Sequence, residues 1–291
     1  MTEPFTGLIA YPITPTTIGG ELNLAATAQL VTEAAAAGVG GITVLASSGA
    51  GVTFDRTERR RVLETAVKAA AGSGVPVYAA VTATSTREVV ALTADSEAAG
   101  AAGVLLAPFG YYPLSDAEVR TLFKTVGDAT TLPICFYNKP VQLQYDVTSD
   151  TLLDLARSIN LRGVKESTAR ADVAGRVGQI RSVVGGDVAI GLSGDMTLLR
   201  DLPVADAWHT GLAALLPSEY ASVWRGKDAA EPELARLRAV AAELAQIPRW
   251  VGALHSLALL RGVATAGPRG PFDSALPDDV VRLEGLLEAL Q

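Results

Sequence analysis

Residues 161–168 read LRGVKEST, a short apolar run in which Lys165 is followed by polar residues. A run of this length, bounded by glycine and polar residues, predicts a buried strand whose last residues emerge at the end of a sheet or barrel. Burial at that end disfavours the charged ammonium, so the pKa of Lys165 should fall and free amine should be present near neutral pH. Such an amine can attack a ketone and form a Schiff base. The simpler interpretation is a solvated lysine that ends a strand, and only partners elsewhere in the chain can decide between the two.

The rest of the chain repeats this strand pattern and alternates it with segments of helical period. Eight apolar runs begin near Gly7, Gly41, Pro76, Gly103, Leu132, Leu161, Asp187 and Val204. Helices are expected over 24–37, 55–71, 86–99, 115–128, 149–158 and 170–183, and in the tail over 212–225, 233–245, 250–263 and after Pro277. Eight strand–helix units in 291 residues predict a closed (β/α)8 TIM barrel, since parallel strands need crossover helices and closure removes sheet edges.

Two features complete the fold prediction. Residues 1–211 should form the strands and helices of the barrel, and residues 212–291 the last barrel helix and a C-terminal helical extension of the same structural unit. An open doubly wound sheet is the alternative, weakened because no G-x-G-x-x-G turn follows the first strand.

Helix boundaries are marked by residues with known end preferences. Asp55, Ser85, Ser115 and Ser149 are expected to cap helix N-termini, and Gly38, Gly72 and Gly100 to end helices in the left-handed conformation.

Composition excludes several classes of protein. Acidic residues outnumber basic ones by 31 to 24, giving a net charge of −7 without long charged blocks, which argues against nucleic acid or an anionic membrane as a partner. The single cysteine, Cys135, allows no internal disulfide and no zinc set, so we expect no metal and a reducing cytoplasm. No export signal or apolar segment of ~18 residues is present, which predicts a soluble, cytoplasmic protein.

Polar residues stand at the ends of other predicted strands, where barrel enzymes carry their chemistry. Ser47, Ser48 and Gly49 follow the second strand, and two hydroxyls beside turn N–H groups can bind a carboxylate, although an ordinary turn would have the same composition. Tyr137 ends the fifth strand and could relay protons if its hydroxyl faces the barrel axis, or could simply pack in the core.

Four short motifs together resemble the dihydrodipicolinate synthase and N-acetylneuraminate lyase family of class I aldolases. They are GVKES at 163–167, FYNKP at 136–140, SSG at 47–49 and LSGD at 192–195, and the resemblance extends over nearly the whole chain. The family consists of (β/α)8 barrels, so the resemblance agrees with the fold predicted from the strand pattern.

The resemblance implies Schiff-base chemistry on pyruvate or another 2-oxo acid. Lys165 matches the imine-forming lysine and Tyr137 the proton-carrying tyrosine, while Ser47 and Ser48 match the hydroxyls that hold the carboxylate. No metal or organic cofactor is implied, and the small-molecule substrate is the expected partner. The family also implies a homo-oligomer, a dimer of dimers. Ser193 and Gly194, in the short loop after the seventh strand, are expected to contact substrate.

The sequence also departs from the family pattern. Ala50 replaces the usual acidic residue, and Gln142 stands where an arginine would hold the carboxylate of the aldehyde substrate. A neutral amide cannot supply that charge-assisted contact. Tyr111 or Tyr112 could be the catalytic tyrosine donated across a subunit interface, although the pair is displaced along its loop. His209, at the end of the eighth strand, could contact substrate or pack in the core.

Three hypotheses follow. The first is a lyase or aldolase that reversibly cleaves or condenses a hydroxy-oxo acid through a lysine imine. The second is a dehydratase of a deoxy-oxo sugar acid on the same scaffold. The third is a non-catalytic paralogue that binds 2-oxo acids without turnover. Appearance or disappearance of pyruvate separates the first from the second, and imine trapping separates both from the third.

Overall fold

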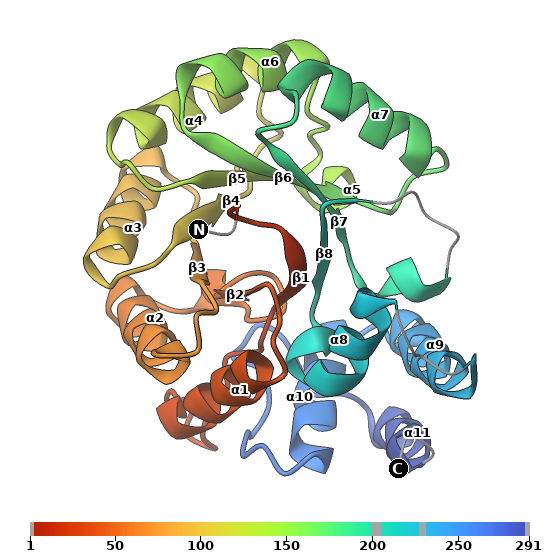
Figure 1. The fold of residues 1–291 in the computed structure, drawn as a ribbon. Coiled ribbons are helices and arrows are strands. Elements are labelled where there is room, and N and C mark those ends of the chain that lie inside the picture. Colours follow the sequence, from red (N-terminus) through yellow and green to blue (C-terminus); the bar gives the residue numbers. More distant parts are fainter. Residues whose placement is uncertain (1–2, 200–204, 227–230, 289–291) are drawn as a thin grey trace.

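The computed structural model describes residues 3–199, 205–226 and 231–288 (Figure 1). Eight parallel strands pair in chain order and close into a barrel, β8 pairing with β1. The strands are β1 (Gly7–Ala10), β2 (Gly41–Val44), β3 (Val77–Ala80), β4 (Gly103–Leu106), β5 (Ile134–Asn138), β6 (Leu161–Ser167), β7 (Ala189–Ser193) and β8 (Ala207–Thr210). The predicted (β/α)8 barrel is confirmed and the open doubly wound sheet is wrong. Val204, the expected start of the eighth run, lies outside the described residues.

Helices surround the strands as an outer ring (Figure 1). The helices are α1 (Leu24–Ala36), α2 (Arg56–Ala70), α3 (Thr86–Ala98), α4 (Asp116–Asp128), α5 (Pro140–Leu143), α6 (Ser149–Ser158), α7 (Val173–Val184), α8 (Pro217–Arg225), α9 (Glu231–Gln246), α10 (Trp250–Leu260) and α11 (Pro277–Glu288). Short 3-10 helices follow three strands: η1 (Gly51–Thr53), η2 (Asp195–Leu199) and η3 (Leu212–Ala214). The sequence pattern did not indicate α5, η1 or η2. No helix in the described ranges is both long and apolar enough to cross a membrane.

Most helix ends are where the cap residues predicted them. Asp55, Ser85 and Ser115 each accept a hydrogen bond from a backbone N–H in the first turn. The prediction for α6 is wrong by one residue: Thr148 is the N-cap and accepts from the N–H of Thr151, because its backbone is still extended where the helix begins. The glycines that end α1, α2 and α3 all have positive φ: Gly38 (+73°), Gly72 (+80°) and Gly100 (+84°).

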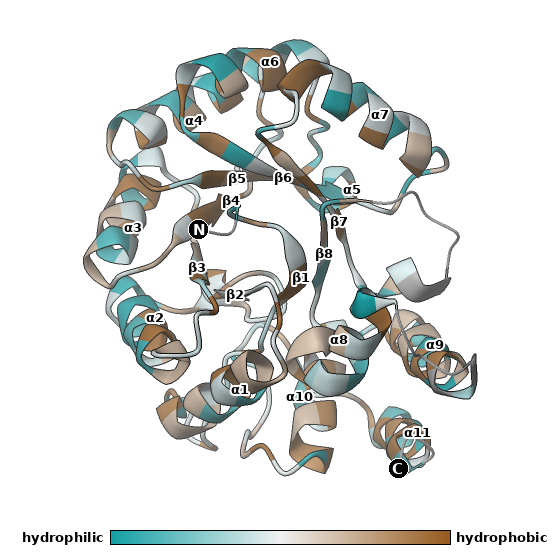
Figure 2. Ribbon diagram, in the orientation of Figure 1, coloured by the Kyte–Doolittle hydropathy of each residue, from teal (hydrophilic) through white to brown (hydrophobic). Residues whose placement is uncertain are grey.

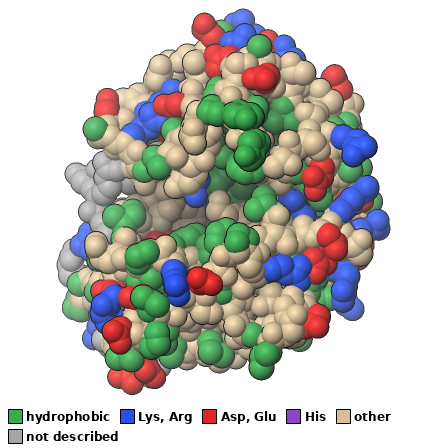
Figure 3. All heavy atoms as spheres, turned by 180° about the vertical axis from the view of Figure 1, so that it is seen from behind, with side chains coloured by type: hydrophobic (Ala, Val, Ile, Leu, Met, Phe, Trp, Pro, Cys, Tyr) green, Lys and Arg blue, Asp and Glu red, His purple; other side chains and the backbone are tan. Residues whose placement is uncertain are grey.

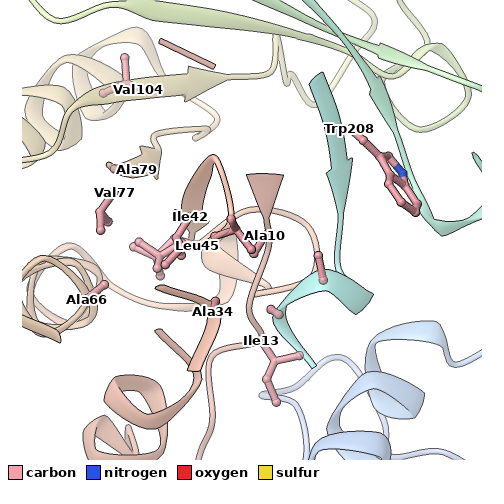
Figure 4. Packing of buried hydrophobic residues seen from close by; sticks show 14 of the residues in the cluster. Ala10, Ile13, Ala34, Ile42, Leu45, Ala66, Val77, Ala79, Val104 and Trp208 are labelled. Atoms are coloured by element: carbon pink, nitrogen blue, oxygen red, sulfur yellow. The ribbon is translucent and has the colours of Figure 1, made fainter. Parts of the chain in front are cut away.

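Alternation along the strands separates two apolar layers. In β5, Ile134 and Phe136 face the helices, and Phe136 stacks on Phe123 of α4 with ring centroids 4.5 Å apart. Cys135 and Tyr137 face the barrel axis and belong to a second, interior cluster. Figure 4 shows the packing of buried residues from strands and helices, and Figure 2 shows the apolar strands at the centre of the molecule. Because successive side chains of a strand point to opposite faces, every second side chain points toward the barrel axis.

The C-terminal helices pack on the barrel. Leu212 of η3 and Leu254 and Leu257 of α10 are fully buried and share the outer core with strand residues. α9 lies against η2, and α11 packs on α9 and α10. This arrangement brings Trp250, at the start of α10, to the cavity at the end of the barrel. Residues 289–291, the end of the predicted extension, lie outside the described residues.

Candidate active site

Lys165 occupies an inward position near the carboxyl end of β6. It pairs in register with Tyr137 of β5 on one side and with Gly191 of β7 on the other. Its side chain is only 4% exposed, and Nζ lies 3.7 Å from the ring centroid of Tyr11 and 4.0 Å from that of Tyr137. Burial disfavours the ammonium and lowers the pKa of Lys165. The site therefore holds an amine that releases its proton more readily than a solvated lysine does.

Tyr137 presents its hydroxyl to the same space. Its Oη lies 3.3 Å from Oγ of Ser193. Burial by itself raises the pKa of Tyr137, but the positive charges of Lys165 and Lys139 and hydrogen bonds with Ser193 and Ser47 outweigh it and lower the pKa to about 8. A phenol with this pKa can both give and take a proton near neutral pH.

A tyrosine–histidine pair lies on the other side of the lysine. The hydroxyl of Tyr11 is 2.7 Å from Nδ1 of His209, and both side chains are buried. Burial and the charge of Lys165 lower the pKa of His209 well below its usual value, so the imidazole is neutral. A Cβ on Gly191 would lie 2.0 Å from Nε2 of His209, so the ring fits only because residue 191 is glycine. Sequence analysis singled out His209 but missed Tyr11.

Ser47, Ser48 and Gly49, which the sequence suggested for binding a carboxylate, form the turn after β2. Ser48 is buried and donates its hydroxyl hydrogen to the carbonyl of Tyr11 at 2.8 Å. Ser47 is exposed and lines the cavity. The carbonyl of Gly49 accepts from Thr14 Oγ1 at 2.8 Å, which ties the turn to the segment after β1. The hydroxyl hydrogen of Ser48 is therefore already used, whereas the hydroxyl of Ser47, which also hydrogen-bonds Tyr137, faces the cavity. The N–H groups of Ala50 and Gly51 donate to the carbonyls of Ser47 and Ala46 at 3.2 and 3.4 Å.

The backbone around this turn is unusual. Leu45 has a φ of +64° and Ala50 a φ of +47°, and both are non-glycine residues in the left-handed region. A Cβ on Gly51 would lie 1.9 Å from the carbonyl oxygen of Leu45, so only glycine fits there. Strained conformations of this kind cost on the order of 1–3 kcal/mol each and cluster at functional sites.

A buried ion-pair network fixes the ends of β5 and β6. Glu166 is fully buried; its carboxylate contacts Arg170 Nη2 at 2.9 Å and Arg176 Nε at 3.3 Å. Asn138 donates from Nδ2 to both oxygens of Glu166, at 3.1 and 2.9 Å, and to Asp146 at 2.8 Å. Because Glu166 directly follows Lys165, this network holds the strand end from which the lysine projects. Sequence analysis did not find it.

The loop after β7 is held by hydrogen bonds from both backbone and side-chain groups. Gly194, with a φ of +109°, donates its N–H to the carbonyl of His209 at 2.8 Å and accepts from Trp208 Nε1 at 3.0 Å. The carboxylate of Asp195 is buried, which raises its pKa, and it accepts hydrogen bonds from Thr210 Oγ1 and from a backbone N–H of η3. Ser193, Gly194 and His209, all predicted site residues, line the cavity around Lys165.

The predicted aromatic pair lies apart from this cavity. Tyr111 and Tyr112 follow β4, are 89% and 75% exposed, and pack edge to face with centroids 5.1 Å apart. Neither is among the described residues that line the cavity around Lys165. Within one copy of the chain, therefore, the structure does not bring this pair to the lysine. Gln142, on α5, does line the cavity.

Two adjoining cavities open at this end of the barrel. The lysine chamber, of about 340 Å³, contains Lys165, Tyr11 and His209 in its walls. The side chamber, of about 310 Å³, lies toward β3 and β4. The two chambers share five lining residues, namely Ser47, Tyr137, Lys139, Gln142 and Trp250. Figure 3 shows the face opposite that of Figure 1, which is hollowed and carries hydrophobic side chains at the rim of the hollow. In the described part of the chain, no group of three or more His, Cys, Asp or Glu residues is placed to hold a metal ion.

A closed (β/α)8 barrel with a buried amine between two phenol rings at its carboxyl end defines an enzyme of the class I aldolase type, which works through a lysine imine. Comparison with known proteins gives the family. The model of the Dihydrodipicolinate synthetase family matches residues 4–251. A 4-hydroxy-tetrahydrodipicolinate synthase of Nitrobacter hamburgensis is 33% identical over 248 residues, which cover 83% of this chain and 82% of that protein. The chain belongs to the dihydrodipicolinate synthetase family.

Solved structures show the same relationship. A dihydrodipicolinate synthase from Agrobacterium tumefaciens superposes with a TM-score of 0.89 at 32% identity, over 99% of this chain and 98% of that one. A prophage protein of E. coli K12 that belongs to the dihydrodipicolinic acid synthase family, solved in complex with pyruvate, has a TM-score of 0.88 at 25% identity and 99% coverage of both chains. A sialic acid aldolase from Ruminococcus gnavus, at 17% identity and a TM-score of 0.86, shares the fold.

Proposed function

We propose that this aldolase acts on pyruvate or a closely related 2-oxo acid and reversibly joins it to an aldehyde. The observation that carries the proposal is the amine of Lys165, buried at the barrel mouth within 4.0 Å of the centroids of two tyrosine rings and beside a turn that offers donors to a carboxylate. The relative from E. coli that was solved with pyruvate supports this class of substrate.

The reaction begins with attack of the Lys165 amine on C2 of the 2-oxo acid. Loss of one water gives the imine, and its protonated form withdraws electrons from C3. Removal of a proton from C3 gives an enamine, whose C3 forms a carbon–carbon bond with the aldehyde carbon while the aldehyde oxygen takes a proton. Hydrolysis by one water then releases a 4-hydroxy-2-oxo acid and returns the free amine. The reverse sequence cleaves that acid.

The neighbours of Lys165 have distinct proposed roles. Tyr137, with its pKa of about 8, carries protons to and from the intermediates. Ser47 and the turn N–H groups through Gly49 hold the carboxylate, while Ser48 fixes the turn through its hydrogen bond to the carbonyl of Tyr11. The Tyr11 ring faces the amine at 3.7 Å, where its π face stabilises the cationic imine.

Borohydride trapping tests this function. Reduction in the presence of pyruvate should give a protein whose intact mass has gained one pyruvate, less one water, plus two hydrogens. Lys165→Met should give no adduct, whereas Lys139→Met, which removes the other lysine at the cavity, should still give it. An adduct that persists in Lys165→Met would overturn the assignment. Turnover of a sugar acid without release of pyruvate would favour a dehydratase instead.

We also propose that the enzyme works in the cytoplasm as a homotetramer, a dimer of dimers. The lone, unpaired Cys135 suits a reducing compartment.

Exposed Tyr111, Tyr112 and Val141 provide apolar surface for a second copy, which would also let the aromatic pair approach a neighbouring site. Light scattering after size exclusion measures the mass in solution, and a monomer would contradict the proposal.

A further inference from the structure

The side chamber differs in chemistry from the lysine chamber. Its walls are mainly apolar, from the ends of β2 to β5 and from the C-terminal region. They include Leu45, Leu105, Phe109, Leu143, Val251 and Phe272. Among the described residues that line it, Lys139 carries the only charge, at the junction with the lysine chamber. A cavity of this kind favours an apolar group and offers little to a carboxylate or a chain of hydroxyls.

The chamber also communicates with the reacting centre. Tyr137 and Ser47 line both chambers, and Tyr137 lies with its ring 4.0 Å from Nζ of Lys165. A molecule joined to the imine carbon skeleton can therefore pass Tyr137 and place its distal group in the side chamber. The volume of about 310 Å³ accommodates an aromatic ring or a branched alkyl group.

The lysine chamber, in contrast, is lined mainly by polar side chains, several of which already bond to one another or to the backbone. Ser48 donates to a carbonyl just after β1 at 2.8 Å, and Thr168 donates to the carbonyl of Ser193 at 3.1 Å. The hydroxyl of Ser193 faces Tyr137, and Asp195 accepts from a side-chain hydroxyl and a backbone N–H. The hydroxyl hydrogens of Ser48 and Thr168 are therefore committed to backbone carbonyls. A sugar chain that drew on these hydrogens would leave those carbonyls unpaired, at a cost of about 1–3 kcal/mol each.

We propose that the second substrate of this enzyme is an aldehyde with an uncharged apolar substituent, aromatic or branched, which binds in the side chamber. This inference rests on the proposed function, since the apolar group is placed by reaction with the imine on Lys165. Among the described lining residues of both chambers there is no arginine to bind a second carboxylate. Gln142 adds a neutral amide at the junction and no charge.

A panel of aldehydes tests the substrate class. Pyruvate is supplied with benzaldehyde, with glyceraldehyde and with succinic semialdehyde, and kcat/KM is measured from pyruvate consumption and product mass. The kcat/KM for benzaldehyde should exceed that for each of the other two aldehydes by about tenfold or more. Binding one additional apolar group in an apolar pocket typically changes kcat/KM by at least this factor. A preference for glyceraldehyde would show that the lysine chamber binds a polyol. A preference for succinic semialdehyde would show that Lys139 pairs with a second carboxylate. Either preference overturns the inference.

Substitutions at the rim locate the binding site. Val52 and Phe272 line the side chamber and are 57% and 40% exposed, so Val52→Asp and Phe272→Asp should fold, which the Tm of each verifies. Each should lower the benzaldehyde-to-glyceraldehyde ratio of kcat/KM by about tenfold, because a carboxylate disfavours an apolar neighbour. Val281→Asp, a matched change at a 66% exposed position on α11, should leave the ratio unchanged. An unchanged ratio in both rim variants overturns the location.

Failure of this inference and failure of the proposed function give different results. If pyruvate is trapped on Lys165 but benzaldehyde is not the preferred acceptor, the function stands and the apolar substrate class is wrong. If pyruvate leaves no adduct on Lys165 after borohydride, the function and the inference fall together.

Discussion

Replacing Glu166 by glutamine removes the charge from a carboxylate that solvent does not reach. Glu166 contacts Arg170 at 2.9 Å and Arg176 at 3.3 Å, and the Arg176 side chain is itself buried. Removing one partner of a buried ion pair typically lowers the free energy of unfolding by about 3–5 kcal/mol, because the other charge stays buried without a partner. Asp146 stays 2.9 Å from Arg170 and 3.8 Å from Arg176 and compensates in part, so the lower end, about 3 kcal/mol, is expected.

Thermal unfolding measures this cost. At about 2–4 °C per kcal/mol, Glu166→Gln should lower Tm by roughly 6–12 °C. Glu64→Gln is the matched control, since Glu64 pairs with Arg60 at 2.7 Å on the surface of α2 with both side chains about half exposed. The control should change Tm by less than about 2 °C. Equal shifts in the two variants would show that the buried network does not stabilise the end of β6.

Three further changes probe the site. In Lys165→Met, the pKa of Tyr137 should rise above about 8, because burial still raises it while the positive charge of Lys165 is gone. Tyrosinate absorbance measured against pH checks this. A tyrosine that still ionises near pH 8 in the variant would show that Lys165 does not lower the pKa of Tyr137. Tyr137→Phe should slow turnover by about 10²–10⁴-fold while pyruvate trapping at saturation survives, and an unchanged kcat would remove the phenol from proton transfer. Gly51→Ala should displace the turn, because its Cβ would lie 1.9 Å from the carbonyl oxygen of Leu45; a pyruvate affinity equal to wild type would contradict the role of the turn.

The barrel could be predicted because each strand and helix is indicated by residues within its own short segment of the sequence. Each strand is a short apolar run, and α1 to α4, α6 and α7 each begin at a residue whose side chain caps the helix. A repeated strand–helix unit then has few ways to close. The error at α6, where Thr148 and not Ser149 is the cap, reflects two neighbouring hydroxyl residues that sequence alone cannot rank. The helices η1 and η2 were missed because three to five residues give too short a pattern.

The site could be predicted only in part. Lys165 and Tyr137 stand out at strand ends, and register then places them side by side on the barrel axis. The contact between Tyr11 and His209 joins residues 198 positions apart, so it depends on closure of β8 onto β1. The partners of Glu166 likewise come from three segments. Such contacts leave no periodic signal in the sequence.

The exposed aromatic pair lies apart from the lysine chamber within one chain. Sequence position suggested that Tyr111 or Tyr112 serves catalysis, and the structure shows both rings exposed on the loop after β4. In the proposed tetramer, contacts between copies would bring one of these rings to the lysine of a neighbouring chain. A catalytic role for Tyr111 or Tyr112 therefore requires the proposed tetramer, and the mass of the assembly in solution is the first test of that role.

The crystal structure of the enzyme soaked with pyruvate tests the central claim most directly. Continuous electron density should join Nζ of Lys165 to C2 of pyruvate, with the carboxylate on the turn that contains Ser47 and Gly49 and the methyl group toward Tyr137. Pyruvate bound elsewhere, or held near Lys165 without a covalent bond at full occupancy, would contradict the account.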